Sequence, residues 1–198
     1  AVSLPASYWA VQGLETSFFA ALLVLSLWRL AEEDGQGGVC PASAVLAGIA
    51  MVTRPEAPLF VAGIALGRLL GALHRREGWR PLVRWGIPFV LPGAAWLTFR
   101  LAYYGYPLPN TFYAKGNPAP LHEVLGYLHP WLALEAPFAL AGAVGLVVLL
   151  AFRSRRSVAL ILVLAAELVF VRRCAGDWMP NQRLLVALLP LLGAAGAR

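Results

Sequence analysis

The stretch VRWGIPFVLPGAAWLTFRLAY, residues 83–103, decides the fold that the sequence predicts. Its only charged side chains are Arg84, near the start, and Arg100, near the end. A helix of about 20 mostly apolar residues is long enough to cross the ~30 Å hydrocarbon core of a bilayer. The stretch therefore predicts a membrane-spanning helix.

The rest of the chain has the same character. Hydrophobic residues make up 60% of the 198 positions, charged residues 13%, and the mean hydropathy is +0.69, which is rare for a water-soluble domain. We therefore predict an all-α fold, a polytopic transmembrane helical bundle with about six or seven apolar segments in one domain, residues 1–198. The segments are 9–31, 39–52, 57–73, 83–103, 130–152, 158–171 and 184–197.

The two ends of the chain suggest a longer protein. The first residue is not methionine, and the last apolar segment, 184–197, would form about 21 Å of helix at ~1.5 Å per residue. That length falls short of the ~30 Å of hydrocarbon. We expect the chain to be a fragment of a longer polytopic protein.

The connectors between the apolar segments are of two alternating kinds. RLAEEDGQGG (29–38), HRREGWRPLVR (74–84) and RSRR (153–156) are plain charge clusters. VQGLET, TRPEAP, YYGYPLPNTFYAKGNPAP and RRCAGDWMPNQR set single charges among aromatic residues, glycines and prolines. If successive segments alternate in direction, the two kinds lie on opposite faces, and the more basic kind is expected on the cytoplasmic side. The polar connectors of the second kind are then expected outside.

Charged groups at the predicted outer helix ends allow two interpretations. Glu15, Glu56 and Asp177 either line a polar pocket or act as helix-terminal charges and ion-pair partners of arginine. Arg54 either forms a local pair with Glu56 or holds a phosphate through its planar guanidinium group. For Asp177, the roles of general base and metal ligand are open, and the flanking arginines favour a salt bridge.

The connector at 103–120 is the richest in possible ligand contacts. Tyr104 and its neighbours suit an interfacial aromatic belt. Asn110, Thr111 and Tyr113 alternate amide and hydroxyl groups with aromatic faces, as a sugar-binding surface does. Lys115, the only lysine, adds a mobile cation that can meet a phosphate. No glycine-rich phosphate loop or metal-ligand spacing is visible in the sequence, and the basic surplus suits membrane orientation rather than a nucleic-acid partner.

Four motifs in order, GLETSFFAALL, TRPEAPLF, YYGYPLPNTFYAK and GDWMPNQR, resemble polyprenyl-phosphate-dependent glycosyltransferases of the C-type membrane superfamily. The likeness is greatest to the terminal arabinofuranosyltransferase branch of actinobacterial cell-wall assembly, and it covers nearly all of the chain. It implies a partial C-type membrane core in the bacterial inner membrane. Such an enzyme transfers a sugar from a lipid-linked phosphate donor to a glycan, lipid or protein acceptor of the cell envelope, at the outer face.

The resemblance also implies roles for residues in one outer cavity. The donor phosphate is assigned to Arg54, Lys115 and Arg183, the substrates to Glu15, Glu56, Tyr104, Asn110, Thr111 and Tyr113, and base catalysis to Asp177. No covalently bound cofactor is expected, and the use of a divalent metal is left open. Relatives carry an acidic motif upstream of the point where this chain begins. We therefore expect this fragment to be inactive alone, with Asp177 as the base only if the missing segment supplies none.

Two other functions remain open on the sequence. A transporter of a small solute would place charged groups deeper in the membrane, and Arg100, Glu135 and Glu167 fall at such positions. A non-catalytic membrane scaffold is the third possibility. The clustering of unusual connectors on one predicted face favours surface chemistry over passage through the membrane.

Overall fold

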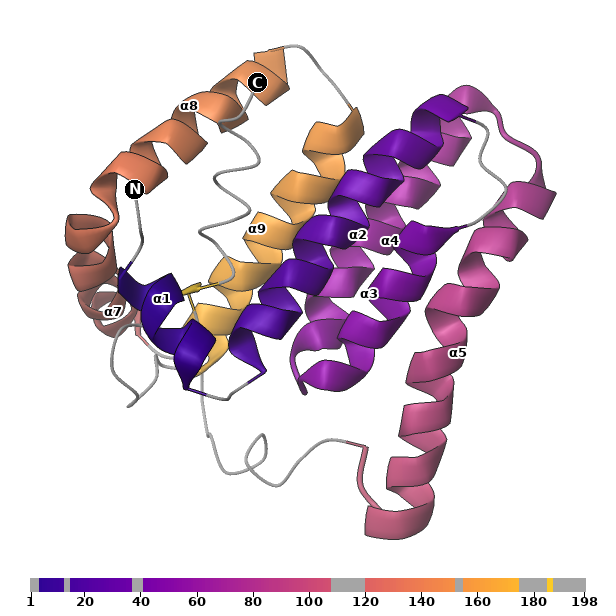
Figure 1. The fold of residues 1–198 in the computed structure, drawn as a ribbon, viewed down its shortest axis with the longest axis horizontal. Coiled ribbons are helices and arrows are strands. Elements are labelled where there is room, and N and C mark those ends of the chain that lie inside the picture. Colours follow the sequence, from indigo (N-terminus) through magenta and orange to yellow (C-terminus); the bar gives the residue numbers. More distant parts are fainter. Residues whose placement is uncertain are drawn as a thin grey trace.

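The computed structural model describes residues 4–12, 15–36, 41–107, 120–151, 155–174 and 185–186. In this part of the chain the long regular elements are all α-helices (Figure 1), so the all-α prediction is confirmed. The helices are α1 (Leu4–Val11), α2 (Thr16–Gln36), α3 (Ala42–Thr53), α4 (Ala57–Arg75), α5 (Trp79–Tyr104), α7 (Leu121–Leu134), α8 (Ala136–Ala151) and α9 (Arg155–Cys174).

Two of the described helices, α4 and α5, are long and apolar enough to cross a membrane. Helix α5 contains the whole of the stretch 83–103 and extends it at both ends. Helix α3 is also apolar but shorter than a full span. The structure thus supports a membrane protein through two helices, and the larger number of spans stays a prediction.

Two predicted segments are interrupted, which corrects their boundaries. Segment 9–31 is divided between α1, which ends at Val11, and α2, which begins at Thr16. The sequence has Gly13 at this division, and glycine is a poor helix former. Segment 130–152 is divided at Glu135, whose φ of −110° and ψ of 21° are not helical. A continuous helix would place Pro137 in its interior, whereas the break leaves that proline in the first turn of α8, where it is tolerated.

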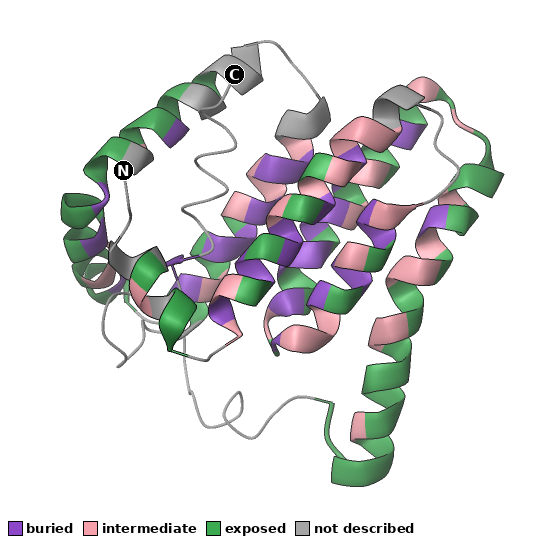
Figure 2. Ribbon diagram, viewed as in Figure 1, coloured by how far each residue is buried: buried purple, intermediate pink, exposed green. Residues whose placement is uncertain are grey.

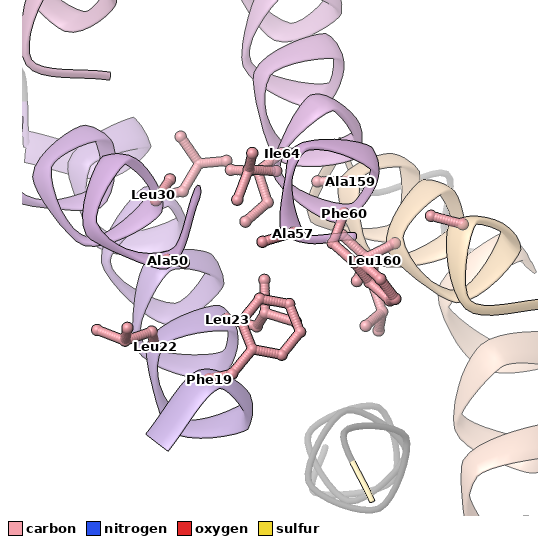
Figure 3. Packing of buried hydrophobic residues seen from close by; sticks show 14 of the residues in the cluster. Phe19, Leu22, Leu23, Leu30, Ala50, Ala57, Phe60, Ile64, Ala159 and Leu160 are labelled. Atoms are coloured by element: carbon pink, nitrogen blue, oxygen red, sulfur yellow. The ribbon is translucent and has the colours of Figure 1, made fainter. Parts of the chain in front are cut away.

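The buried residues concentrate where α2, α3, α4 and α9 meet (Figure 2). Helix α4 packs against α9, α2 against α3, and α3 against α5. Figure 3 shows the interior of this cluster, where the rings of Phe19 and Phe60 meet edge to face with centroids 5.5 Å apart. Leu23 and Ile64 are fully buried beside them. Most of the side chains of α5 are exposed, because in the described structure α5 packs mainly on α3.

Glycines allow the closest helix approaches. A Cβ atom added at Gly67 of α4 would lie 2.5 Å from the Cβ of Ala159 in α9, and one at Gly48 of α3 would lie 2.7 Å from the carbonyl oxygen of Pro88 in α5. Small residues at helix contacts are typical of membrane bundles, because they let backbones pack directly on one another. The spacing of α4 and α9 therefore depends on Gly67.

A buried polar contact joins three helices at the start of α3. The backbone N–H of Ser43 donates to Oε1 of Glu33 at 2.9 Å, and the Ser43 hydroxyl donates to Oε2 of the same carboxylate. The indole Nε1 of Trp85 donates to Oγ of Ser43 at 2.8 Å. Glu33 of α2 thus satisfies an N-terminal donor of α3, and Trp85 brings α5 to the same point. In the sequence, Glu33 belongs to a plain charge cluster, so this role was not predicted.

Replacing Ser43 with alanine is expected to lower the free energy of unfolding by about 1–2 kcal/mol, because the Trp85 N–H loses its acceptor and the Glu33 carboxylate loses a donor. Thermal unfolding in detergent micelles measures the loss. Ser26→Ala is the control: Ser26 is as deeply buried, but its hydroxyl donates only to the Leu22 carbonyl of its own helix, at 2.7 Å. Equal losses in the two variants would contradict this account of the contact.

The turn between α4 and α5 holds a second charged group of residues. Nη2 of Arg68 lies 2.7 Å from Oε2 of Glu77, and Nε of Arg75 pairs with Oε1 of the same carboxylate. Burial alone would raise the pKa of Glu77, but the hydrogen bonds and charges of Arg68 and Arg75 outweigh it and bring the pKa below its usual 4.5. These pairs fasten the turn to the last part of α4.

A lowered folded-state pKa means that the ionised Glu77 stabilises the fold above its unfolded-state pKa, and that this contribution is lost as pH falls through the folded-state value. Glu77→Gln should therefore melt at a lower temperature than the parent at neutral pH. The difference should shrink at pH values below about 4.5. Melting curves in detergent across this range test the prediction, and a difference that grows on acidification would contradict it.

The alternation of the connectors is visible in the fold. In Figure 1 the start of α2, the turn between α3 and α4, and the end of α9 lie at the lower end of the bundle. The end of α2, the turn between α4 and α5, and the start of α9 lie at the upper end. The described helix ends that flank the site-like connectors before α2, between α3 and α4 and after α9 therefore lie at one end of the bundle, and those that flank the plain charge clusters lie at the other.

Candidate functional site

Four charged side chains gather at the lower end of the bundle, and we call them the Arg54 cluster: Glu15, Arg54, Glu56 and Glu167. Glu15 immediately precedes α2, Arg54 and Glu56 lie in the turn between α3 and α4, and Glu167 belongs to α9. The cluster thus joins residues that are far apart in the chain. Two of the sequence motifs, GLETSFFAALL and TRPEAPLF, meet in it.

The prolines of TRPEAP explain how the turn positions Arg54. Arg54 ends α3 in an extended conformation, with φ −140° and ψ 148°, as expected for the residue before Pro55. Pro58 lies in the first turn of α4, where its missing N–H costs little. The backbone N–H of Ala57 donates to the carbonyl oxygen of Arg54 at 3.1 Å and closes the turn.

The guanidinium group of Arg54 lies among carboxylates. Its Nη2 is 2.5 Å from Oε1 of Glu56, and its Nε is 3.7 Å from Oε1 of Glu15. Its Cζ lies 5.7 Å from the centroid of the Phe19 ring, a cation–π arrangement. The Arg54 side chain is 8% exposed, the Glu56 side chain 11% and the Glu15 side chain 41%. Glu15 is therefore the solvent-facing member of the cluster.

Glu167 is the member of the cluster that the sequence did not assign to the site. It is 1% exposed, and the charges of Arg54 and Glu56 both act on it. Its Oε1 is buried and has no hydrogen-bond partner among the described residues, and the same holds for Oγ1 of Thr16, the first residue of α2. A lone glutamate inside the apolar segment 158–171 was the signal available in the sequence. Only the packing of α9 on α4 shows which residues it faces.

The structure shows ion pairs at Arg54, and its role as a phosphate ligand stays a prediction. Glu15 and Glu56 are its ion-pair partners, which is the alternative that the sequence left open beside a phosphate site. A phosphate arriving at Arg54 has to compete with both carboxylates. Arg54 is therefore placed to hold the turn and the start of α2 together at this end of the bundle.

Tyr104, predicted as a substrate contact, lies elsewhere. It ends α5, is exposed, and packs edge to face on Tyr103. The guanidinium of Arg100 lies 5.3 Å from the Tyr104 ring centroid, and its Nε donates to the carbonyl oxygen of Pro107 at 3.1 Å. In Figure 1 the end of α5 is separated from the start of α2, so the structure does not bring Tyr104 to the Arg54 cluster.

Arg100 and Glu135 were noted in the sequence as deep charges. Arg100 instead belongs to the end of α5, where it also lies over the Trp96 ring. Glu135 is 3% exposed and occupies the break between α7 and α8. The two residues lie on separate elements, and the described contacts do not join them into one path.

The remaining predicted site residues lie outside the described part of the chain: Asn110, Thr111, Tyr113, Lys115, Asp177 and Arg183. Within the described residues, no group of three or more His, Cys, Asp or Glu side chains is arranged to hold a metal ion. Comparison with known proteins found no matching family model, no matching curated protein and no matching solved structure.

Proposed function

We propose that the chain is part of a membrane glycosyltransferase that uses a polyprenyl-phosphate-linked sugar as donor and a cell-envelope molecule as acceptor. The observation that carries the proposal is the contact between Glu15 and Arg54. It joins two of the motifs on which the family resemblance rests. The other two motifs begin in the sequence at or just after the ends of α5 and α9. Charged groups held at the end of a membrane bundle suit chemistry on a lipid-linked substrate.

The reaction needs a base and cations. An acceptor hydroxyl attacks the anomeric carbon and forms the new glycosidic bond, its proton passes to a carboxylate, and the bond from the sugar to the lipid phosphate breaks. The leaving phosphate takes the electron pair, and cations stabilise its negative charge. We assign the phosphate to Lys115 and Arg183, and the proton to Asp177 if no other segment supplies the base. Arg54 joins them when the phosphate displaces a carboxylate, which is easiest at Glu15, its more distant partner.

The proposal also includes the orientation of the chain in the membrane. The upper end of the bundle, with the Arg-rich turn between α4 and α5, faces the cytoplasm of a bacterial inner membrane, as positive residues do in most membrane proteins. The lower end, with the Arg54 cluster, faces outward. The partners are then membrane lipid, the lipid-linked donor and a glycan, lipid or protein acceptor.

A transporter is the second candidate, and Glu167 is the observation that favours it. A buried glutamate within an apolar helix is typical of proton or substrate paths. The charges that act on Glu167, however, are those of Arg54 and Glu56, in the turn between α3 and α4 at the lower end of the bundle. Surface chemistry is therefore the better supported function.

Sugar transfer by the full-length protein in membranes tests the proposal. A panel of radiolabelled polyprenyl-phosphate sugars is offered to the parent and to Lys115→Ala, Asp177→Asn and Arg183→Ala at matched protein levels. We expect transfer from at least one donor and a loss of at least about 100-fold in the Asp177 variant, the usual size of a general-base effect. The control is Arg80→Ala, an exposed charge at the other end of the bundle. Transfer that none of the three variants reduces, or solute uptake without transfer from any donor, would overturn the proposal.

A further inference from the structure

Helix α5 carries a surface that the proposed reaction does not use. Of its 26 residues only Trp85 is buried, and most of its large apolar side chains are exposed. In the described structure α5 packs mainly on α3, which leaves the rest of its circumference open (Figure 2). An exposed apolar surface of this length, on a helix that is long enough to cross a membrane, is expected to face lipid.

An arginine lies beside an aromatic ring near each end of α5. The Cζ atom of Arg80 lies 5.8 Å from the centroid of the Trp79 ring, and that of Arg100 lies 5.7 Å from the Trp96 ring and 5.3 Å from the Tyr104 ring. The two arginines are 20 positions apart in the chain. This spacing corresponds to about 30 Å of helix at ~1.5 Å per residue, which matches the thickness of the hydrocarbon core. A membrane-spanning α5 therefore brings both guanidinium groups to the level of the lipid headgroups.

The one charge between these two arginines fits the same placement. Arg84 is exposed and lies about one turn from Arg80. A long arginine side chain can run along the helix to the interface while its methylene groups stay in apolar surroundings. Between Arg84 and Arg100 the sequence of α5 has no charged residue. The apolar surface is thus bounded by positive charge at both ends.

The lower end of α5 adds an aromatic surface to its arginine, and we call the group Trp96, Phe99, Arg100, Tyr103 and Tyr104 the Arg100 surface. The Trp96 and Phe99 rings stack with centroids 5.6 Å apart, and the Phe99 and Tyr103 rings stack at 5.5 Å. All four aromatic side chains of the group are exposed. Their faces and edges are therefore open to a ligand that lies beside the guanidinium group.

Arg100 has donors to offer such a ligand. Its Nε donates to the carbonyl oxygen of Pro107 at 3.1 Å, in an exposed contact. The ion pairs between described residues do not include Arg100, whereas Arg54 is paired with two carboxylates. The two Nη atoms of a guanidinium group carry further N–H donors, whose fork matches two oxygens of a phosphate. Arg100 can thus bind a phosphate without first displacing a carboxylate of the described residues.

We propose that the Arg100 surface binds the headgroup of an anionic glycerophospholipid, with the guanidinium of Arg100 on the phosphate and the aromatic rings against the glycerol and the first part of the acyl chains. Tryptophan and tyrosine suit this depth, because each has an apolar ring face and a polar edge. A headgroup with net negative charge is favoured, since in a zwitterionic lipid an ammonium group already accompanies the phosphate. The inference goes beyond the proposed glycosyl transfer: it rests on α5 crossing a membrane.

Native mass spectrometry of the full-length protein tests the site. The protein is released from detergent micelles in the presence of phosphatidylglycerol, and the lipids bound to each copy are counted. We expect Arg100→Gln to bind one phosphatidylglycerol molecule about tenfold more weakly than the parent, as expected for lost hydrogen bonds between charged groups, and Arg100→Lys to lose less. The control is Arg29→Gln, because Arg29 already pairs with Glu32 at 2.6 Å. Equal binding by the parent and Arg100→Gln would overturn the proposal.

Competing ligands identify the occupant of the site. In the parent, we expect phosphatidylglycerol to stay bound in the presence of an equal concentration of phosphatidylcholine or polyprenyl phosphate, and in a large excess of inorganic phosphate. Displacement by inorganic phosphate would show a site for a free anion. Preference for polyprenyl phosphate would show a site for the donor lipid, and preference for phosphatidylcholine would show that net charge is not recognised. Each of these three results would overturn the proposal.

Fluorescence quenching tests separately whether lipid covers this face of α5. In vesicles of phosphatidylglycerol with brominated acyl chains, Trp96 should be quenched, so Trp96→Phe should lower the quenched fraction of the tryptophan fluorescence. The control is Trp131→Phe, which should not lower it, because Trp131 is 2% exposed. An unchanged fraction in Trp96→Phe would mean that a second copy or another part of the protein covers the face, and would contradict the proposal. Neither measurement uses sugar transfer, so the two proposals fail separately.

Discussion

Replacing Arg54 with methionine is expected to lower the free energy of unfolding by about 3–5 kcal/mol, the usual cost of removing one partner of a buried ion pair. The Glu56 side chain is only 11% exposed, and the substitution removes the guanidinium group that lies 2.5 Å from its carboxylate. It also removes the only cation acting on Glu167 among the described residues. Thermal or denaturant unfolding in detergent micelles measures the loss.

Two further variants serve as comparisons for the loss of stability in Arg54→Met. Arg80→Met removes an exposed arginine at the other end of the bundle and should change the stability by no more than about 0.5 kcal/mol. Arg54→Lys keeps the charge but not the planar fork, so it should recover only part of the loss. If Arg54→Met were as stable as Arg80→Met, the cluster would not hold the start of α2 to the turn before α4.

Replacing Gly67 with leucine is expected to cost about 3 kcal/mol or more, because the first added atom already meets helix α9. A Cβ at this position would lie 2.5 Å from the Cβ and 2.8 Å from the Cα of Ala159. The latter is a backbone atom, so α4 and α9 must move apart to accept it. The measurement is the melting temperature in detergent, together with the expression level of folded protein in membranes.

Gly126→Leu is the matched control for this substitution. Gly126 lies inside α7, is exposed, and has no neighbouring atom within 4 Å of an added Cβ. Leucine is the better helix former, so this variant should be as stable as the parent or more stable by up to about 1 kcal/mol. Similar losses at the two glycines would mean that α4 and α9 do not pack as closely as described.

A helix could be predicted from the sequence where a long apolar stretch marks it. The stretch 83–103 lies within α5, and the connector assigned to 103–120 begins where α5 ends at Tyr104 and stops just before α7 begins at Leu121. The break at Glu135 was missed, because a count of apolar residues does not register a proline that interrupts the backbone. The break after Val11 falls in the predicted connector VQGLET, although segment 9–31 was drawn across it. Hydropathy alone therefore merged short helices into longer segments.

The candidate site was predictable only in part, for a similar reason. The pairing of Arg54 with Glu56 is local, and a two-residue spacing in a proline-bounded turn predicts it. The influence of the same charges on Glu167 depends on how α9 packs on α4 through Gly63 and Gly67, which sequence spacing does not encode. The exposed position of Tyr104 likewise follows from the single contact face of α5.

Locating the binding site of the lipid-linked donor tests most directly the central claim that the chain is part of a glycosyltransferase. A photoreactive polyprenyl-phosphate analogue is activated with the full-length protein in membranes, and the labelled peptides are identified by mass spectrometry. We predict labelling in segments 53–58, 103–115 and 176–183, which carry three of the motifs on which the family resemblance rests. Labelling confined to segments 74–84 and 153–156, the plain charge clusters, would contradict the account.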